Sequence, residues 1–316
     1  MPNTSSTGSQ SKKTAGSTAA KKTSSKKNAA STRFAERQAR KEEEARLARQ
    51  ERNKRYAFVA IGLAVVLVAV LVIVKFASGG SGTSNNSAAG GDIPSPPRGT
   101  PIPTATLSKL QSVPLSTLHS APTTGILTTP QAVSGKALTA NGKPELLYIG
   151  AEFCPYCAGE RWPMYVALSK FGTFSPNPGK IHSATQDGNI PTFSFYGTSY
   201  TSPYFAFTPV EVSTNYLAPN GNYAPLETPT PAQASLWQKG NGGSYPYVNF
   251  GGKSQLTEAQ FSSATMQNMS FDAVAAQVGD NSTTNGANIG AAASQLIKTI
   301  CTDLTHNQPA AVCSSS

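Results

Sequence analysis

Gly-Ala-Glu-Phe-Cys-Pro-Tyr-Cys-Ala-Gly, residues 150–159, is the stretch of this 316-residue chain that decides its fold. An apolar run at 146–149 comes directly before it and predicts a short buried strand. A helical pattern follows it over about 156–171. Cys154 and Cys157 therefore lie at a turn from a strand into a helix, and this part of the chain predicts an α/β unit.

The position of the two cysteines predicts a reactive dithiol. A thiolate at a helix N-terminus meets unpaired backbone N–H groups and the positive end of the helix dipole, which lower its pKa from about 8.5 toward roughly 3.5–7.5. Pro155 fits the first helical position, where its missing N–H is not needed. We therefore expect Cys154, at the exposed mouth of the helix, to be the nucleophile. Cys157, one turn along, is placed to resolve a mixed disulfide.

The same spacing is also found in half of a zinc site, but such a site needs a second pair of ligands. No second pair has a suitable spacing, and His119, His182 and His306 are scattered along the chain. The sequence also contains no phosphate loop or haem motif. We therefore expect neither a metal nor a cofactor.

Two stretches resemble the thioredoxin superfamily. Residues 151–157 are similar to the thioredoxin active-site turn, with Phe153 where thioredoxins usually have Trp, and the Cys-Pro-Tyr-Cys tetrad is typical of glutaredoxins. Residues 244–253, Ser-Tyr-Pro-Tyr-Val-Asn-Phe-Gly-Gly-Lys, resemble the stretch where such folds place a cis-proline beside the dithiol. The resemblance implies that Pro246 is this proline and that the backbone of Tyr245 and Pro246 pairs with bound substrate. From the residues alone, a proline before a strand simply starts the strand.

A wider resemblance covers about two-thirds of the chain, residues 107–313. It is to membrane-anchored, thioredoxin-like proteins of archaea and bacteria that are catalogued only as a domain of unknown function. The shared stretches are 142–157, 160–162, 191–193, 209–211 and the late cysteine pair. This resemblance implies a thioredoxin-like fold, a central mixed sheet flanked by helices, with an enlarged β and loop insertion between Cys157 and Pro246. It implies no established activity.

The first 104 residues predict a tail, a membrane span and a tether. Residues 1–56 hold 15 Lys/Arg and 5 Glu, and we expect a basic cytoplasmic tail that is disordered and then helical. Residues 57–76 contain 18 consecutive uncharged residues, long enough for a transmembrane helix. Residues 77–104, rich in Gly, Ser and Pro, predict a flexible linker. The thioredoxin-like domain is then expected over 105–316.

Charge and cysteine usage predict the compartment and the partners. The excess of Lys and Arg before the span predicts that the N-terminus lies in the cytoplasm and the domain outside it. We therefore expect a protein that crosses the cell membrane once. All four cysteines follow residue 150, which suits an oxidising compartment. A cleaved signal peptide is the alternative, but a 56-residue leader is far too long for an ordinary n-region. The expected partners are the lipid bilayer, protein thiols or disulfides, and a membrane redox partner as a further candidate. Nucleic-acid binding is not expected, because membrane insertion already accounts for the basic charge.

The remaining predicted elements follow from local patterns. They are a helix over 107–118 interrupted by Pro114, a turn at 138–143 with Asn141-Gly142 at its tip, strands over 192–196 and 204–212, a loop over 214–231, and helices over 231–240, 257–266, 270–278 and 286–304.

Several side chains near the dithiol are candidates for tuning its pKa. The position that holds a buried proton-transfer acid in thioredoxin is Tyr148 here, so Glu152 or Glu160 would have to replace that acid. From its position in the sequence alone, Glu152 is expected to be a solvated carboxylate beside a turn. Arg161 is expected on the helix surface. Its alternative role is to lower the pKa of the thiol.

Cys301 and Cys313 are expected to form a structural disulfide that fixes the C-terminal tail. The alternative is a second redox pair that exchanges with the first.

Two functions remain open from the sequence. The first is a membrane-anchored, extracytoplasmic thiol–disulfide oxidoreductase in which Cys154 attacks, Cys157 resolves, and Tyr245-Pro246 clamps the substrate. The second is a non-catalytic binding module in which the Cys154–Cys157 pair is a static disulfide.

Overall fold

The computed structural model describes residues 99–314. The predicted tail at 1–56, the predicted span at 57–76 and most of the predicted linker at 77–104 lie outside the described residues. Within 99–314, no helix combines the length and the apolar character that crossing a bilayer would require.

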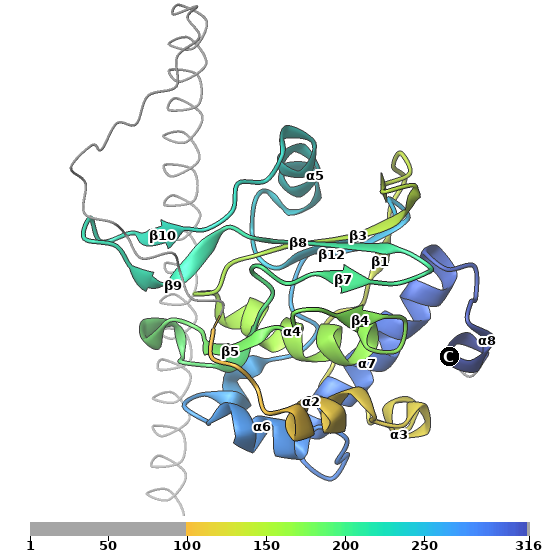
Figure 1. Ribbon diagram of the computed structural model, residues 1–316, viewed down its shortest axis with the longest axis horizontal. Coiled ribbons are helices and arrows are strands. Elements are labelled where there is room, and N and C mark those ends of the chain that lie inside the picture. The colour runs from red at the N-terminus through yellow and green to blue at the C-terminus, as the bar shows by residue number, and fades with distance from the viewer. Residues whose placement is uncertain (1–98, 315–316) are drawn as a thin grey trace, which may run out of the picture. The chain divides into compact units, whose positions relative to one another are not determined.

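A mixed sheet forms the centre of the domain (Figure 1). Its central strand is β3 (Lys143–Gly150), which runs parallel to β8 (Ala206–Glu211) and antiparallel to β11 (Tyr247–Phe250). Beyond β11 lie β12 (Ser254–Leu256) and then β1 (Gln131–Ala132), both in antiparallel pairing. The sequence therefore correctly predicted an α/β domain with a strand before the dithiol.

The hairpin that leads into β3 also follows the prediction. β2 (Thr139–Ala140) pairs with the start of β3, and Asn141 and Gly142 form the turn with φ angles of 52° and 74°. Two consecutive positive φ angles are what a two-residue type I′ hairpin turn needs, and Asn-Gly meets that need at the least steric cost.

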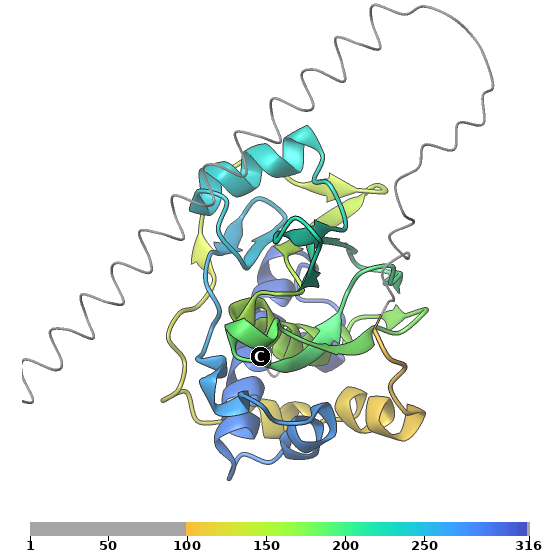
Figure 2. The same cartoon turned by 90° about the vertical axis from the view of Figure 1, so that its left-hand side faces the viewer.

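Helices cover both faces of the sheet. Figures 1 and 2 both show α5 (Pro231–Asn241) on one side, and α4 (Pro155–Leu168) and α7 (Thr284–Asp303) on the other. The remaining helices are α2 (Thr104–Gln111), α3 (Leu115–His119), α6 (Phe271–Gln277) and α8 (Ala310–Cys313).

The side chains of β3 alternate between these two layers. Leu146 and Tyr148 join the large core around α4 and α7, while Leu147 and Ile149 pack with Trp237 of α5. Residues 145–150 are buried throughout, as expected for a strand covered on both faces.

Three small two-stranded pairs lie outside the main sheet: β5 (Gly179–His182) with β6 (Pro191–Ser194), β4 (Thr173–Phe174) with β7 (Tyr200–Thr201), and β9 (Ser213–Leu217) with β10 (Tyr223–Pro225). The predicted loop over 214–231 is therefore wrong, since it contains the β9–β10 hairpin. The polar and turn-forming residues of this segment gave no alternating pattern from which the two strands could be predicted.

The predicted helix over 257–266 is also wrong in its first half. Only Ser263–Met266 forms a short 3-10 helix. Gln260 instead accepts the N–H of Leu127 at 2.7 Å through its carbonyl, and Phe261 pairs with Ile126. Pairing with a distant segment thus replaces helical hydrogen bonds here.

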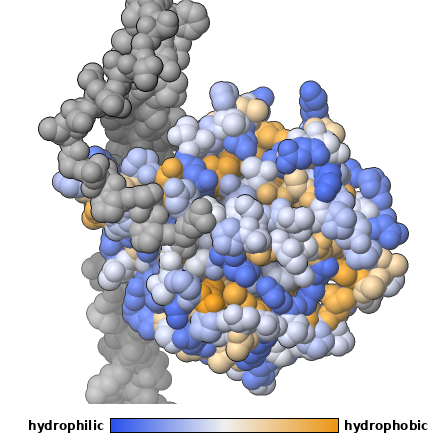
Figure 3. Space-filling view, viewed as in Figure 1, coloured by the Kyte–Doolittle hydropathy of each residue, from blue (hydrophilic) through white to orange (hydrophobic). Residues whose placement is uncertain are grey.

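Large apolar side chains are mostly buried in the described part of the chain. Those that are exposed are Leu127, Tyr156, Tyr216 and Leu217. Figure 3 correspondingly shows small separate apolar patches among polar surface on the face that it presents. Two of the four exposed residues belong to the β9–β10 hairpin.

Candidate dithiol site

Cys154 and Cys157 occupy the turn from β3 into α4, as predicted. Both are free thiols in this structure. Cys154 is the N-cap residue of α4, and its Sγ accepts the backbone N–H of Cys157 at 3.3 Å. The first helical turn therefore directs a backbone donor at this sulfur.

The predicted exposure of Cys154 is wrong. Its exposed fraction is only 4%, because Phe153, Val212 and Tyr245 pack against the two cysteines. Val212 and Tyr245 come from segments far along the chain, and these segments cover the mouth of the helix.

The two thiols differ in acidity. Burial alone would raise the pKa of Cys154, but hydrogen bonds from the side chain and backbone of Cys157, together with the positive charge of Arg161, lower it. Burial raises the pKa of Cys157 well above its usual value, and the hydrogen bond to Cys154 raises it further. Of the pair, Cys154 is thus the sulfur that more readily carries the negative charge.

Arg161 is not on the helix surface, contrary to the expectation. Its side chain is fully buried, and its Nε and Nη2 donate to the two carboxylate oxygens of Glu211 at 2.8 and 2.7 Å. The Nη2 group also donates to the carbonyl of Ala151 at 2.8 Å. Two parallel hydrogen bonds between a guanidinium and a carboxylate are the geometry that suits a buried ion pair. They hold the positive charge of Arg161 beneath the turn that contains the cysteines.

Glu152 is not solvated either. It is 3% exposed, and its Oε1 accepts the hydroxyl of Ser194 at 2.5 Å. Burial and the neighbouring charge of Glu211 raise the pKa of Glu152 to about 7, although hydrogen bonds from Ser194 and the backbone of Asn215 oppose this rise. A carboxyl group beside the dithiol can therefore gain or lose a proton near neutral pH.

Glu160 is directed toward a different segment. Its Oε2 accepts the backbone N–H of Gln260 at 2.9 Å, and the side chain is completely buried. Burial raises the pKa of Glu160 to about 8. This placement makes Glu160 a buried neutral acid of the α4 core at neutral pH.

Tyr148, the residue that the resemblance aligns with the buried acid of thioredoxin, is fully buried. Its hydroxyl is buried and has no hydrogen-bond partner among the described residues. A Cβ atom at Gly150 would lie only 2.0 Å from this hydroxyl oxygen, so the glycine makes room for the tyrosine. Burial raises the pKa of Tyr148 well above its usual value, so this hydroxyl stays protonated.

Tyr245, which directly precedes Pro246, packs against the two cysteines although it is some 90 positions away in sequence. The Tyr245–Pro246 peptide bond is cis. The β11 strand that follows pairs with β3, with Tyr247 opposite Ile149, and the ring of Tyr245 lies 6.0 Å from that of Phe153. The antiparallel pairing of β11 with β3 is what brings the two sequence stretches together.

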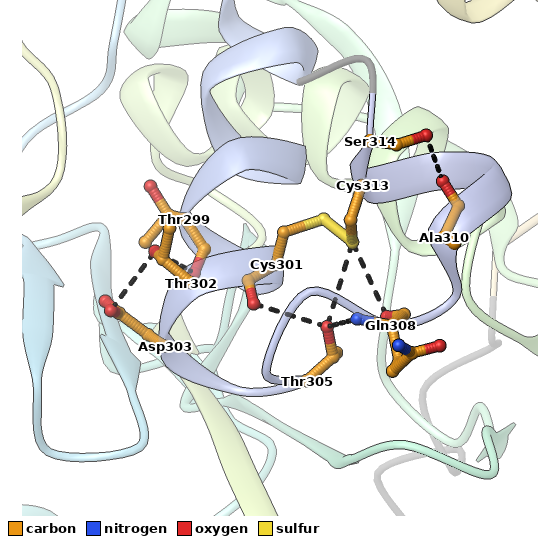
Figure 4. The surroundings of a disulfide bond; sticks show 9 residues. All are labelled: Thr299, Cys301, Thr302, Asp303, Thr305, Gln308, Ala310, Cys313 and Ser314. Atoms are coloured by element: carbon orange, nitrogen blue, oxygen red, sulfur yellow. Dashed lines mark hydrogen bonds between the residues drawn. A yellow bond between two sulfur atoms is a disulfide. The ribbon is translucent and has the colours of Figure 1, made fainter.

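The late cysteines form the predicted disulfide. Cys301 at the end of α7 is bonded to Cys313 of α8, with their Cα atoms 5.6 Å apart (Figure 4). The bridge closes a short loop, a constraint that contributes up to about 3 kcal/mol to stability.

The described residues contain no cluster of three or more His, Cys, Asp or Glu side chains that could hold a metal ion.

Sequence reasoning missed Glu211 and Ser194 as neighbours of the site. Glu211 did belong to one of the stretches shared with the thioredoxin-like group, and a carboxylate at the end of an apolar strand was a signal that could have singled it out.

Comparison with known proteins gives one match. Neither the curated proteins nor the solved structures contain a match to this chain. Residues 129–302, which include the dithiol, the Arg161–Glu211 pair and Pro246, match the family described as a domain of unknown function, DUF929. This match covers more than half of the chain's residues, so the chain belongs to the DUF929 family.

Proposed function

We propose that this protein is a membrane-anchored, extracytoplasmic thiol–disulfide oxidoreductase whose redox centre is Cys154 and Cys157. One observation carries the proposal. Cys154 caps α4 and has a lowered pKa, whereas the pKa of its partner Cys157 is raised. This asymmetry is what an attacking thiol and a resolving thiol need.

The geometry supports a two-step exchange. The thiolate of Cys154 attacks one sulfur of a client disulfide, forming a mixed disulfide and releasing the other client sulfur as a thiolate. Cys157 then loses its proton and attacks Cys154, which releases the second client thiolate and leaves the pair oxidised. Glu152, two residues before Cys154 and with a pKa of about 7, is our candidate acid–base group for the exchange. The same steps in reverse oxidise a client dithiol.

The surrounding structure supports a thioredoxin-like fold for this centre. The mixed sheet with helices on both faces is consistent with that fold. The backbone of Tyr245 and Pro246, beside the dithiol, is our candidate for pairing with an extended client segment, as the resemblance implies.

The proposed location outside the cytoplasm rests on two observations. The uncharged stretch at 57–74, within the predicted span, follows a strongly basic tail, and cations on one side of a span keep that side cytoplasmic. The Cys301–Cys313 disulfide is of the kind that persists in oxidising compartments. The bilayer, client proteins and a membrane redox partner are accordingly the proposed partners.

Trapping of clients tests the proposed function. The Cys157→Ser protein is expected to accumulate mixed disulfides with client proteins, because Cys154 can attack but nothing resolves the complex. These adducts are detected as high-mass, thiol-sensitive species on a non-reducing gel of the cells that express the full chain.

The control is the Cys154→Ser protein, which keeps the buried, less acidic thiol and is expected to form no adducts. Equal trapping by the two variants, or none by either, would argue for the static binding module instead.

A further inference from the structure

The β9–β10 hairpin is held against the dithiol turn by a set of backbone and side-chain hydrogen bonds. The backbone N–H of Glu152 donates to the carbonyl of Ser213 at 2.9 Å. The side-chain amide of Asn215 donates to the carbonyl of His182 at 2.8 Å, and the backbone of Asn215 bonds to the carboxylate of Glu152. The start of the hairpin is therefore anchored two residues from Cys154.

The far strand of the hairpin places an aromatic ring on the neighbour of Cys154. The ring of Tyr223 stacks on that of Phe153, with centroids 4.0 Å apart and planes within 2° of parallel. The hydroxyl of Tyr223 donates to the carboxylate of Asp187 at 2.5 Å and accepts from the amide of Gln186 at 2.7 Å. These contacts fix the ring in place beside the redox centre.

Leu217 extends this surface outward. It lies directly opposite Tyr223 in the β9–β10 pairing, and residues directly opposite in an antiparallel pair project from the same face. The side chain of Leu217 is 52% exposed. Phe153 and Tyr223 stack, and Leu217 lies opposite Tyr223 in the hairpin; these three side chains, here called the apolar wall, lead from the neighbour of Cys154 to an exposed residue. Tyr216 projects from the opposite face of β9.

We propose that the apolar wall binds the residue that flanks the client's reactive cysteine, and that clients are extended polypeptide segments with an apolar residue at that position. This inference rests on the proposed function, because the client's sulfur must reach Cys154 while its neighbour lies on the wall. Successive residues of an extended chain are about 3.3 Å apart, so a flanking side chain falls within reach of the wall.

The charges around the wall argue for an apolar rather than an anionic neighbour. The carboxylate of Asp187 is engaged by Tyr223, and the guanidinium of Arg161 is engaged by Glu211 beneath the turn. An anionic client residue on the wall would lose water and meet the negative charge of Asp187, which is unfavourable. The same argument disfavours small anionic disulfides such as oxidised glutathione as preferred substrates.

The test measures exchange rates of the reduced full-length protein with two peptides. Each peptide carries one cysteine as a mixed disulfide with thionitrobenzoate, and the peptides differ only in having Leu or Asp beside that cysteine. Attack by Cys154 on the peptide sulfur forms the Cys154–peptide disulfide and releases the coloured thionitrobenzoate thiolate. The Cys154→Ser protein gives the background rate.

We expect the wild-type protein to react with the Leu peptide roughly tenfold faster than with the Asp peptide, as one apolar contact of this size allows. The Leu217→Ser variant should lose most of that preference. The Tyr216→Ser variant, which removes an exposed ring from the opposite face of the same strand, should keep it.

The inference would be overturned if both peptides released thionitrobenzoate at equal rates, or if both hairpin variants lost the preference equally. Neither outcome would contradict the proposed function. No release above the Cys154→Ser background from either peptide would overturn the proposed function, and this inference with it.

Discussion

Replacement of Glu160 by Gln should change the free energy of unfolding by about 4 kcal/mol more in the stabilising direction at about pH 9 than at about pH 5. The folded protein holds the pKa of Glu160 at about 8, against 4.5 for an ordinary glutamate, because the side chain is buried. Between these values the folded state binds more protons than the unfolded state. The wild-type protein therefore loses stability as the pH rises from about 4.5 through 8, and the Gln variant avoids this particular loss.

Chemical denaturation at the two pH values measures this effect. Gln preserves an acceptor for the backbone N–H of Gln260 and resembles the neutral acid in shape. The matched control is Glu258→Gln, which removes a charge from an exposed position in the neighbouring segment and should change either value by no more than about 0.5 kcal/mol. A Glu160→Gln effect of the same size at both pH values would contradict the buried neutral acid.

Replacement of Arg161 by Met is expected to destabilise the domain by about 3–5 kcal/mol. The substitution leaves the carboxylate of Glu211 buried without its cation, and the loss of a partner costs more than the loss of the whole pair. The same change should raise the pKa of Cys154, because the positive charge of Arg161 contributes to lowering it.

A double-mutant cycle checks the first effect by denaturation. The Arg161→Met/Glu211→Leu protein should be more stable than the Arg161→Met protein, because no uncompensated charge remains in the core. If the two single changes simply add in the double variant, the ion pair does not act as one buried unit. Arg161→Lys, which keeps the charge but loses the two parallel hydrogen bonds, should fall between the wild-type and Met proteins.

The parts of the structure that depend on local patterns were predictable from the sequence. The strand at 146–149, the Asn141-Gly142 turn and the helix that starts after Cys154 each follow from a short stretch of residues. Helix α5 is a further case, since Thr230 caps it in a capping box and Pro231 begins it.

The electrostatics of the site could not be predicted, because they depend on strand register. Glu211 lies opposite Gly150 in the parallel pairing of β3 with β8, and only this register brings its carboxylate to Arg161, 50 residues away. Burial of Glu152 likewise depends on Ser194 and on the β9–β10 hairpin. A pattern of residues in one stretch carries no information on which distant strand will cover it.

The predicted loop over 214–231 shows the same limit. Its strands are short and half-polar, so neither hydrophobic alternation nor length distinguished them from a loop. The proposed apolar wall depends on the stacking of Tyr223 on Phe153, a contact between segments 70 residues apart.

The pH dependence of alkylation of Cys154 tests the central claim most directly. The reduced full-length protein is treated with a small alkylating reagent over a range of pH, and modification of each cysteine is followed by mass analysis of its peptide. Because the thiolate is the reactive form, the rate should rise with pH and level off above the pKa of the attacked thiol. We predict a midpoint for Cys154 clearly below about 8.5, with Cys157 reacting only at higher pH. A midpoint for Cys154 at or above that of an ordinary cysteine, or equal reactivity of the two thiols, would contradict the assignment of Cys154 as the nucleophile.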